Sequence, residues 1–498
     1  MKNLVFGYIN TNVIDGSAIF MSSLCNVLSK RKNTTTELLL AVPKKRNTLL
    51  ADLEKAENIK IIDPFTHSDY KNFGLATRSQ ISIEEAAQLI IMTDEINNYD
   101  RIFIRSLDVT KALLNLKPDL IKRTFSYITG ITSSKQELDQ ESFGYLSTIE
   151  EAGGRFLCQT KHMKQHILSK LPLQENSLID LNPMIPDNPF KFEEIFSKKD
   201  KYNQFVYTGK FASEWNTVPM IVGFRELMEF SDAQLNIAGD QFKKDNNDEK
   251  FVGYSKYLLK NTPHIYWYGA LNRKQSMSLI KNSDVGLSWR SNTLDDSLEL
   301  STKLLEYCRL AKPPIINKTS MHIEIFGEDY PFYADDLSTF IETMKFATEN
   351  PYTVEKYAKI VFDISKNYTF TEISKKLALA LGDDFEDYDF EIDKNIEFFE
   401  ELPRIDGYNS LENINAESMN SEEYQKLLSY TKNLKEQNKE IKKQLQETKA
   451  FAELANDKYK VTMEKYKKVL ADYNRLKSKY GKLIKIKQKI TGALSKNK

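Results

Sequence analysis

The stretch SLELSTKLLEYCRLAKPPII, residues 297–316, combines a polar start, an amphipathic middle and a double proline followed by an apolar run. Its apolar residues recur with the spacing of a helix, which predicts a helix over residues 298–310. Proline cannot continue a helix, so Pro313 and Pro314 end it and begin a predicted buried strand over residues 313–317. A strand, a helix and a further strand in this order are the building unit of a parallel sheet.

The same alternation of short apolar strands and amphipathic helices fills roughly the first 380 residues, in two series. The first series begins at NLVFGYI (3–9) and the second at NQFVYTGK (203–210). A proline-rich stretch between them is typical of a linker. We therefore predict an α/β chain with two facing Rossmann-like domains, residues 1–182 and 187–382. Ligands of such folds bind at the carboxyl ends of the strands, here in the crevice between the domains.

The composition excludes several classes of protein. Lysine plus arginine and aspartate plus glutamate both number 70, so the net charge favours no nucleic-acid partner. The three cysteines, at long spacings, predict neither a disulfide framework nor a zinc site. The N-terminus lacks the features of a signal peptide, and no apolar run is long enough to span a membrane. A cytoplasmic location is expected.

The composition changes after residue 382. Residues 383–418 form an acidic linker, and ten acidic residues lie within 383–401. A heptad pattern then predicts a coiled coil over residues 419–484, through which the chain would self-associate. The alternative is a single, charge-laced, solvent-exposed helix.

The segment 475–498 carries nine basic residues and no acidic one. Leu483, Ile486 and Ile490 can share one helical face, so this basic amphipathic tail is predicted to lie on an anionic membrane surface. A disordered, solubilising tail is the alternative.

Several segments of the chain, taken together and in order, resemble a known family. They are NVIDGSAIFMSSL near the N-terminus and then FVYTGKFASEW, LNIAGD, IYWYGALNRKQSMSLIKNSDVGLSWR, SLELSTKLLEYCRLAKPPIINKT and HIEIFGEDYPFY. The combination is similar to the GT-B glycosyltransferases of family four, the large retaining group, and covers roughly residues 1–380. The resemblance implies transfer of a sugar from a nucleotide donor without a metal or any other cofactor.

The diphosphate of such a donor is a leaving group whose negative charge must be stabilised. The resemblance implies that cations and a helix N-terminus do this in place of a metal. Lys210, Arg290 and Lys303 are the expected ligands, Lys210 standing where the family usually has arginine. Each has the alternative of being an ordinary surface cation. A second family lysine is missing, because Trp215 and Asn216 occupy its place.

Two glutamates complete the expected donor site. Glu306 matches the family glutamate that binds the ribose hydroxyls, a role that suits a carboxylate acceptor. The family's other glutamate would fall on Leu298, and Glu299 follows one residue later. Glu299 is expected to reach the donor sugar if residues 296–300 are still loop. Backbone amides at Ser301 and Thr302 are expected to contact the phosphate and the sugar.

The first domain supplies the remaining candidates. Gly16 and Ser17, in a strand-to-helix turn, are expected to touch the donor, with a plain turn capped by serine as the alternative. Asp15, Tyr127 and Thr129 are candidates for the acceptor side, in a region that lacks the histidine many relatives have.

His162 and His166 are four residues apart but lack a third ligand, so no metal site is expected. His322 is expected to pack structurally.

Together these features predict a metal-independent retaining glycosyltransferase. The donor is expected to be a UDP-sugar carrying a hexosyl or N-acetylhexosaminyl group. The lysine- and asparagine-rich composition suggests an AT-rich bacterial genome, so a cell-envelope glycan or teichoic acid is the expected acceptor. A protein acceptor is one alternative. An inactive scaffold organised by the coiled coil is the other.

Overall fold

The computed structural model describes residues 1–403 apart from 14, 48, 139–142, 246–247 and 387–397, together with residues 465 and 468. The coiled coil predicted over 419–484 and the tail over 475–498 lie almost entirely outside the described residues, as does most of the linker over 383–418. In the described part, no helix combines the length and apolarity needed to cross a bilayer.

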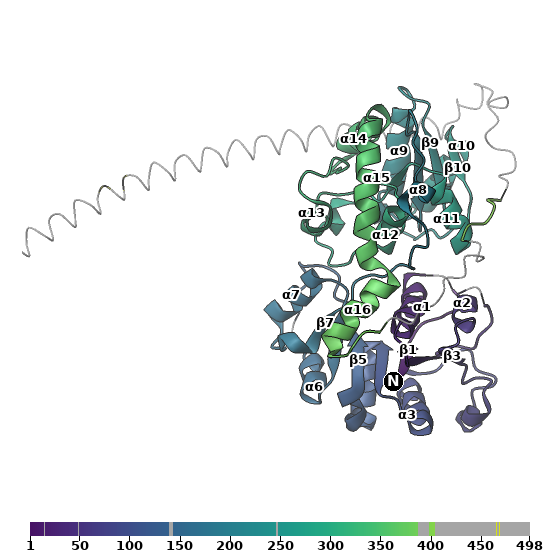
Figure 1. Cartoon of the computed structure of the whole chain (residues 1–498), viewed down its shortest axis with the longest axis vertical. Helices are drawn as coiled ribbons and strands as arrows, with labels where there is room; N and C mark the ends of the chain where they lie inside the picture. The colour runs from purple at the N-terminus through teal and green to yellow at the C-terminus, as the bar shows by residue number, and fades with distance from the viewer. Residues whose placement is uncertain are drawn as a thin grey trace, which may run out of the picture. The chain divides into compact units, whose positions relative to one another are not determined.

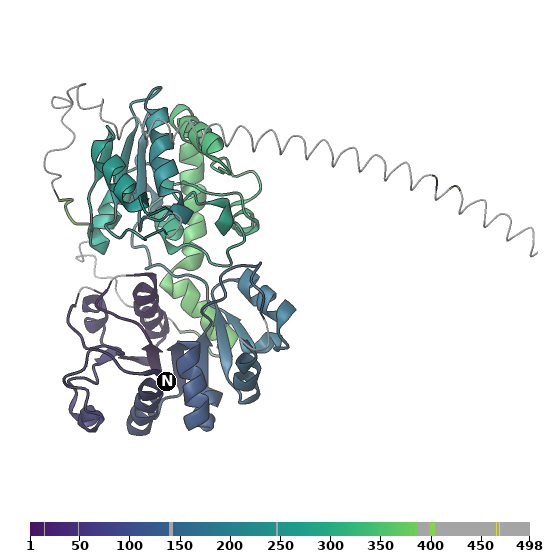
Figure 2. The same cartoon turned by 180° about the vertical axis from the view of Figure 1, so that it is seen from behind.

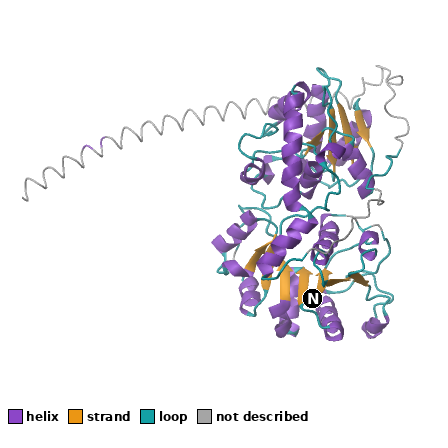
Figure 3. Cartoon of the chain, viewed as in Figure 1, coloured by secondary structure: helices purple, strands orange, loops and turns teal. Residues whose placement is uncertain are grey.

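The first sheet is parallel throughout, with strand order β3-β2-β1-β4-β5-β6-β7. Its central strands are continuous apolar runs because both faces of the sheet are covered by helices (Figure 3). Leu4 and Val5 of the first strand enter separate core clusters, since neighbouring side chains of a strand point to opposite faces. The strands are β1 (Lys2–Gly7), β2 (Thr35–Leu39), β3 (Ile59–Ile62), β4 (Arg101–Arg105), β5 (Thr124–Tyr127), β6 (Arg155–Cys158) and β7 (Leu178–Asp180).

The helices of the first domain connect these parallel strands (Figure 1). They are α1 (Gly16–Ser29), α2 (Ala51–Glu54), α3 (Ile83–Asn97), α4 (Leu107–Leu116), α6 (Tyr145–Glu151) and α7 (Lys161–Lys170), with 3-10 helices η1 (Ser68–Phe73), η2 (Pro118–Arg123) and η3 (Glu175–Ser177).

The second sheet is smaller and also parallel, with strand order β10-β9-β8-β11-β12. Its strands are β8 (Gln204–Thr208), β9 (Gln234–Ala238), β10 (Ile265–Trp267), β11 (Val285–Leu287) and β12 (Pro314–Ile315). Its helices are α8 (Phe192–Ile195), α9 (Thr217–Leu227), α10 (Phe251–Asn261), α11 (Arg273–Lys281), α12 (Thr302–Arg309), α13 (Ser320–Phe326), α14 (Leu337–Glu349) and α15 (Pro351–Ser365), with η4 (Ser213–Trp215), η5 (Asn292–Leu294) and η6 (Lys366–Tyr368). The predicted fold class, two Rossmann-like α/β domains, is confirmed.

The last described helix, α16 (Phe370–Leu381), follows the second domain in sequence but packs on the first. Its Phe370, Ile373 and Leu377 join the core cluster that lies between α1 and the first sheet. The view from behind in Figure 2 shows α16, in light green, among the blue and purple elements of the first domain. Ile185 pairs with Thr369 in a parallel bridge, so the chain crosses between the domains twice at neighbouring places.

Candidate functional site

The helix predicted over residues 298–310 begins later than expected, at Thr302. The residues before it are extended because their backbone groups bond to the first domain. The N–H of Leu298 donates to the carbonyl of Thr132 at 2.9 Å, and the N–H of Leu300 donates to the side chain of Gln159 at 3.0 Å. Glu299 therefore lies in a loop. The sequence predicted contact between Glu299 and the donor sugar on the condition that residues 296–300 form a loop.

Helix α12 is held against the second sheet by Tyr307. A Cβ on Gly286 of β11 would lie 2.4 Å from the Tyr307 ring, so the absence of a side chain there lets the ring pack directly on the strand. The Tyr307 hydroxyl accepts a hydrogen bond from the N–H of Thr208 at 2.9 Å. This contact links α12 to the carboxyl end of β8, where the predicted ligands lie.

The N-terminus of α12 has no side-chain cap. Ser301 occupies the N-cap position, and its hydroxyl makes no capping hydrogen bond. The N–H groups of Thr302 and Lys303 meet no acceptor among the described residues. Free N–H groups at a helix start carry a partial positive charge and favour an anion.

Lys303 places its ammonium over the ring of Tyr207, 4.0 Å from the ring centroid. Burial and, to a lesser extent, the nearby Arg290 lower the pKa of Lys303 to about 7, against the opposing effect of Glu306. None of the described carboxylates lies within ion-pair distance of this ammonium. Lys303 is thus a held cation without a counterion.

Arg290 follows β11 and is fixed through its backbone. Asn317 accepts from the N–H of Arg290 at 2.7 Å and donates to its carbonyl at 2.8 Å. Burial lowers the pKa of Arg290, while the carboxylates of Glu299 and Asp295 raise it. The Arg290 guanidinium forms no ion pair with any described residue. Arg290 and Lys303 are therefore two neighbouring cations near the N-terminus of α12.

His322 lies beside the same loop and is buried. Its Nδ1 lies 2.7 Å from the carbonyl oxygen of Asn317, and burial lowers its pKa to about 4. The ring is therefore neutral near pH 7 and supports the loop that carries Arg290.

Three glycines follow three neighbouring strands of the second sheet. Gly209, Gly239 and Gly269 have φ angles of 147°, 138° and 63°, a region that side chains disfavour. A Cβ on Gly239 would lie 1.9 Å from the carbonyl oxygen of Gly209. The chain therefore has glycine, with no side chain, just after the C-terminal ends of β8, β9 and β10. Lys210, which follows the first glycine, is exposed, and its carbonyl accepts a hydrogen bond from Tyr207.

Glu306 lies one turn along α12 from Lys303, with Oε1 3.7 Å from the guanidinium of Arg273. Arg273 is the first residue of α11 and was not among the predicted site residues. The sequence signal for Arg273 was its place at the start of a helix, shortly after Gly269. A single charged residue at a helix start is too common to identify a site residue.

Glu299 faces residues of both domains. Partial desolvation raises the pKa of the Glu299 carboxyl, and the cations Arg105 and Arg290 act against this rise. Arg105 belongs to the first domain and Arg290 to the second. The carboxylate thus lies where the two domains meet.

On the first-domain side, Tyr127 and Arg105 end β5 and β4. The ring of Tyr127 packs against the ring of Phe20, with the two centroids 4.1 Å apart. The Arg105 guanidinium lies 5.9 Å from the Tyr127 ring centroid. The Arg105 Nε is buried and has no hydrogen-bond partner within the part of the chain that the structure describes. Sequence reasoning missed Arg105, although its place at the end of strand RIFIR is where such folds bind ligands. Thr129 is half-buried in the loop after β5.

The first turn of α1 differs from expectation. The carboxylate of Asp15 accepts from the N–H groups of Ser17 and Ala18, at 2.9 Å each, so Asp15 rather than a serine caps the helix. A Cβ on Gly16 would meet nothing within 4 Å. Gly16 is exposed, while Asp15 and Ser17 are half-buried, and two of the local N–H donors are already used.

The two histidines of α7 point to different partners. His162 lies 3.5 Å from Glu324 of α13, and His166 lies 3.1 Å from the carbonyl oxygen of Gln136. Among the described residues no group of three or more metal-ligating side chains comes together.

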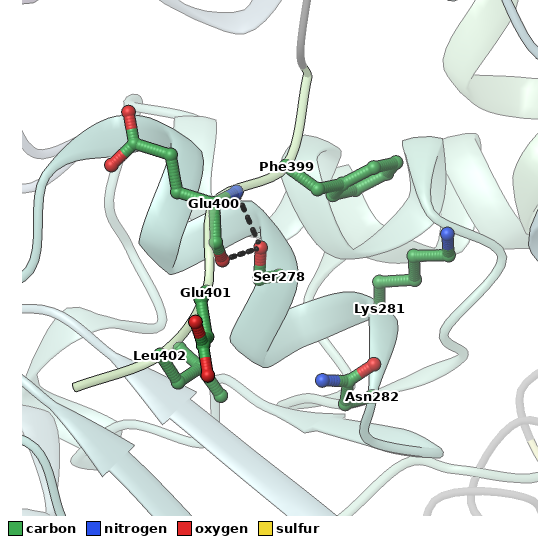
Figure 4. Close-up of a pocket in the computed structure, with 7 residues that line it drawn as sticks. All are labelled: Ser278, Lys281, Asn282, Phe399, Glu400, Glu401 and Leu402. Carbon is green, nitrogen blue, oxygen red and sulfur yellow. Dashed lines mark hydrogen bonds between the residues drawn. The ribbon is translucent and has the colours of Figure 1, made fainter. Parts of the chain in front are cut away.

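A separate cavity of about 490 Å³ lies away from these residues, between α11 and the segment 399–402 (Figure 4). The Ser278 hydroxyl donates to the carbonyl of Glu400 at 2.6 Å and accepts from its N–H at 3.0 Å. The ammonium of Lys281 lies over the ring of Phe399, 4.2 Å from its centroid. This part of the acidic linker is docked on the second domain.

No family model and no curated protein sequence matches this chain. Its structure resembles that of a glycosyltransferase from Rickettsia africae, with a TM-score of 0.54 and 15% identity over 77% of this chain and 100% of that one. HepE of Anabaena, in complex with UDP and glucose, gives 0.52 and 12% over 77% and 99%. S. aureus TarM, in a complex that includes UDP, gives 0.54 and 8% over 76% and 99%. At such identities the likeness shows the fold alone, and that fold is GT-B.

Proposed function

We propose that this protein is a metal-independent, retaining glycosyltransferase that uses a UDP-sugar. One observation carries the proposal: Lys303 and Arg290 lie unpaired at the uncapped N-terminus of α12. Neither cation has an ion-pair partner among the described residues, and their burial and mutual repulsion cost free energy that a bound dianion would offset. The complexes of HepE and TarM with UDP support this choice of nucleotide.

The proposed reaction uses the residues at the domain junction. Lys303, Arg290 and the N–H groups of Thr302 and Lys303 stabilise the charge that develops on the departing diphosphate. The acceptor hydroxyl attacks the anomeric carbon on the face from which the diphosphate leaves, so configuration is retained, and its proton passes to a diphosphate oxygen. Glu299 contacts the donor sugar and Glu306 binds the ribose, near Arg273. Lys210 lies at the rim.

The acceptor is proposed to bind on the first domain, near Tyr127, Thr129 and Arg105. A cell-envelope glycan or a teichoic acid is the proposed acceptor, and the transferred group is a hexose or an N-acetylhexosamine. The proposed oligomerisation through residues 419–484 and membrane binding through residues 475–498 would bring the site to such a polymer. A flotation assay with anionic liposomes, with and without residues 475–498, tests the membrane contact.

The test of function is a thermal-shift screen of nucleotide sugars on the full chain in the presence of EDTA. We expect a UDP-sugar to raise the melting temperature and to be consumed when a polymer acceptor is added. Glu306→Gln should weaken binding, whereas Glu342→Gln on the exposed face of α14 should not. If no nucleotide sugar raises the melting temperature, the inactive scaffold is favoured and the proposal is rejected.

A further inference from the structure

The loop of residues 296–300, here called the junction loop, belongs to the second domain by sequence but is bonded to the first. The N–H of Ser134 donates to the carbonyl of Asp296 at 2.9 Å, and the N–H of Leu298 donates to the carbonyl of Thr132 at 2.9 Å. Ser133 and Ser297 pair in an antiparallel bridge between these two bonds. The junction loop thus pairs with the loop after β5 through a single antiparallel bridge.

Two side chains after β6 complete the attachment. The hydroxyl of Thr160 donates to the carbonyl of Leu298 at 2.7 Å, and the Gln159 side chain accepts from the N–H of Leu300 at 3.0 Å. Thr160, Leu298 and Leu300 are almost fully buried. Buried polar groups are costly to leave unpaired, so these bonds fix the junction loop firmly.

Glu299 lies between the two fixed residues. The carbonyl before it and the N–H after it are both bonded to the first domain, while its own N–H donates locally to the hydroxyl of Ser297. The position of the Glu299 carboxylate is therefore set relative to Tyr127 and Arg105 of the first domain. The cations that would hold the diphosphate, Lys303 and Arg290, belong to the second domain.

We infer that Gln159 and Thr160 are positioning residues for sugar transfer, which act by holding the Glu299 loop to the first domain. The acceptor domain would then place the carboxylate that contacts the donor sugar, while the second domain holds the nucleotide. This inference rests on the proposed function. It predicts that weakening the attachment slows transfer without weakening nucleotide binding.

The experiment compares Gln159→Met and Thr160→Val with the wild-type full chain. Each variant removes one bond to the junction loop at similar side-chain size. Misplacing a reacting group costs rate steeply, so we expect kcat to fall about tenfold for each variant. The Kd for UDP and the KM for the donor should change less than about twofold, because the diphosphate ligands are untouched.

Thr160 also caps α7 by accepting from the N–H of Met163 at 3.1 Å, so its variant needs controls. Thr160→Ser keeps the hydroxyl and should restore kcat. Ser106→Ala removes a comparable cap, on α4 of the same domain, and should lower stability without lowering kcat. Equal kcat in Gln159→Met, Thr160→Val and the wild type would overturn the inference, as would a parallel loss of UDP binding.

Amide hydrogen exchange supplies a readout that does not depend on activity. Gln159→Met should speed exchange at the N–H of Leu300, and unchanged exchange there would also overturn the inference. If the wild-type chain bound UDP but transferred no sugar, the proposed function would fail, and exchange would still decide whether Gln159 holds the loop.

Discussion

The N-termini of α1 and α12 each follow a strand of a parallel sheet, one in each domain, but they are completed differently. At α1, the carboxylate of Asp15 accepts from two free N–H groups. At α12, Ser301 leaves the corresponding groups open, and two cations lie unpaired beside them. One helix start is capped by a carboxylate of the chain, whereas the other has no side-chain cap.

The proposed donor site depends on this difference, because N–H groups at a helix start are available to an anion only where the chain supplies no acceptor of its own. Both helices follow a parallel strand, and both were expected to touch the donor. The geometry favours α12 for the phosphates, because Asp15 would compete with them at α1. The following predictions change one helix start at a time, from the largest expected effect to the smallest.

The largest effect is expected from removing the cations at α12. Lys303→Met and Arg290→Met each take away a charge-assisted contact to the developing diphosphate, so kcat/KM for a UDP-sugar should fall at least about 100-fold in each case. A transfer assay measures this, with Lys260→Met on the exposed face of α10 as a matched control. Activity within a few fold of wild type in both variants would remove α12 from the donor site.

A carboxylate placed at the uncapped helix should make α12 resemble α1. In Ser301→Asp, the new side chain can accept from the first-turn N–H groups and stabilise the fold by about 1 kcal/mol. It also repels the diphosphate, so the Kd for UDP should rise about tenfold or more. Calorimetric titration measures the Kd. Ser301→Asn, a cap without charge, separates occupation of the donors from repulsion and should raise the Kd less. Tighter UDP binding in Ser301→Asp would contradict the comparison.

The pH dependence of binding tests the charge on Lys303. Its pKa in the free protein is about 7, and a bound diphosphate raises it, so binding takes up a proton above this pH. Affinity for a UDP-sugar should therefore fall as pH rises, by about tenfold from roughly pH 7 to 8.5. A UDP-sugar is the right probe because its diphosphate does not titrate in this range. Lys303→Arg keeps its charge and should flatten the profile. A wild-type profile as flat as that of Lys303→Arg would show that Lys303 does not titrate on binding.

Part of this site could be predicted from the sequence and part could not. The order of strands and helices follows from local spacing, and the structure has it so. The roles expected for the residues of α12 came from the resemblance and stay predictions. The helix ends at Arg309, before the double proline. The start of α12 was placed four residues early, because Leu298 and Leu300 bond to residues about 140 positions away, which no local pattern contains. Arg105 and Arg273 were missed since single charged residues carry no periodic signal. The packing of α16 on the first domain likewise depends on contacts between residues far apart in the sequence, which local patterns do not reveal.

The smallest effect should come from the helix that is already closed. Asp15→Ala removes the cap of α1 and leaves the N–H groups of Ser17 and Ala18 without their acceptor, which should lower stability by about 1 kcal/mol. Chemical denaturation measures the loss. If α1 takes no part in holding the diphosphate, the Kd for UDP should stay within about twofold of wild type. A marked gain in UDP affinity would instead mean that the Asp15 carboxylate had been repelling a phosphate at α1. In that case both helix N-termini would contact the diphosphate, and α1, capped by Asp15, would contribute less to its binding than α12.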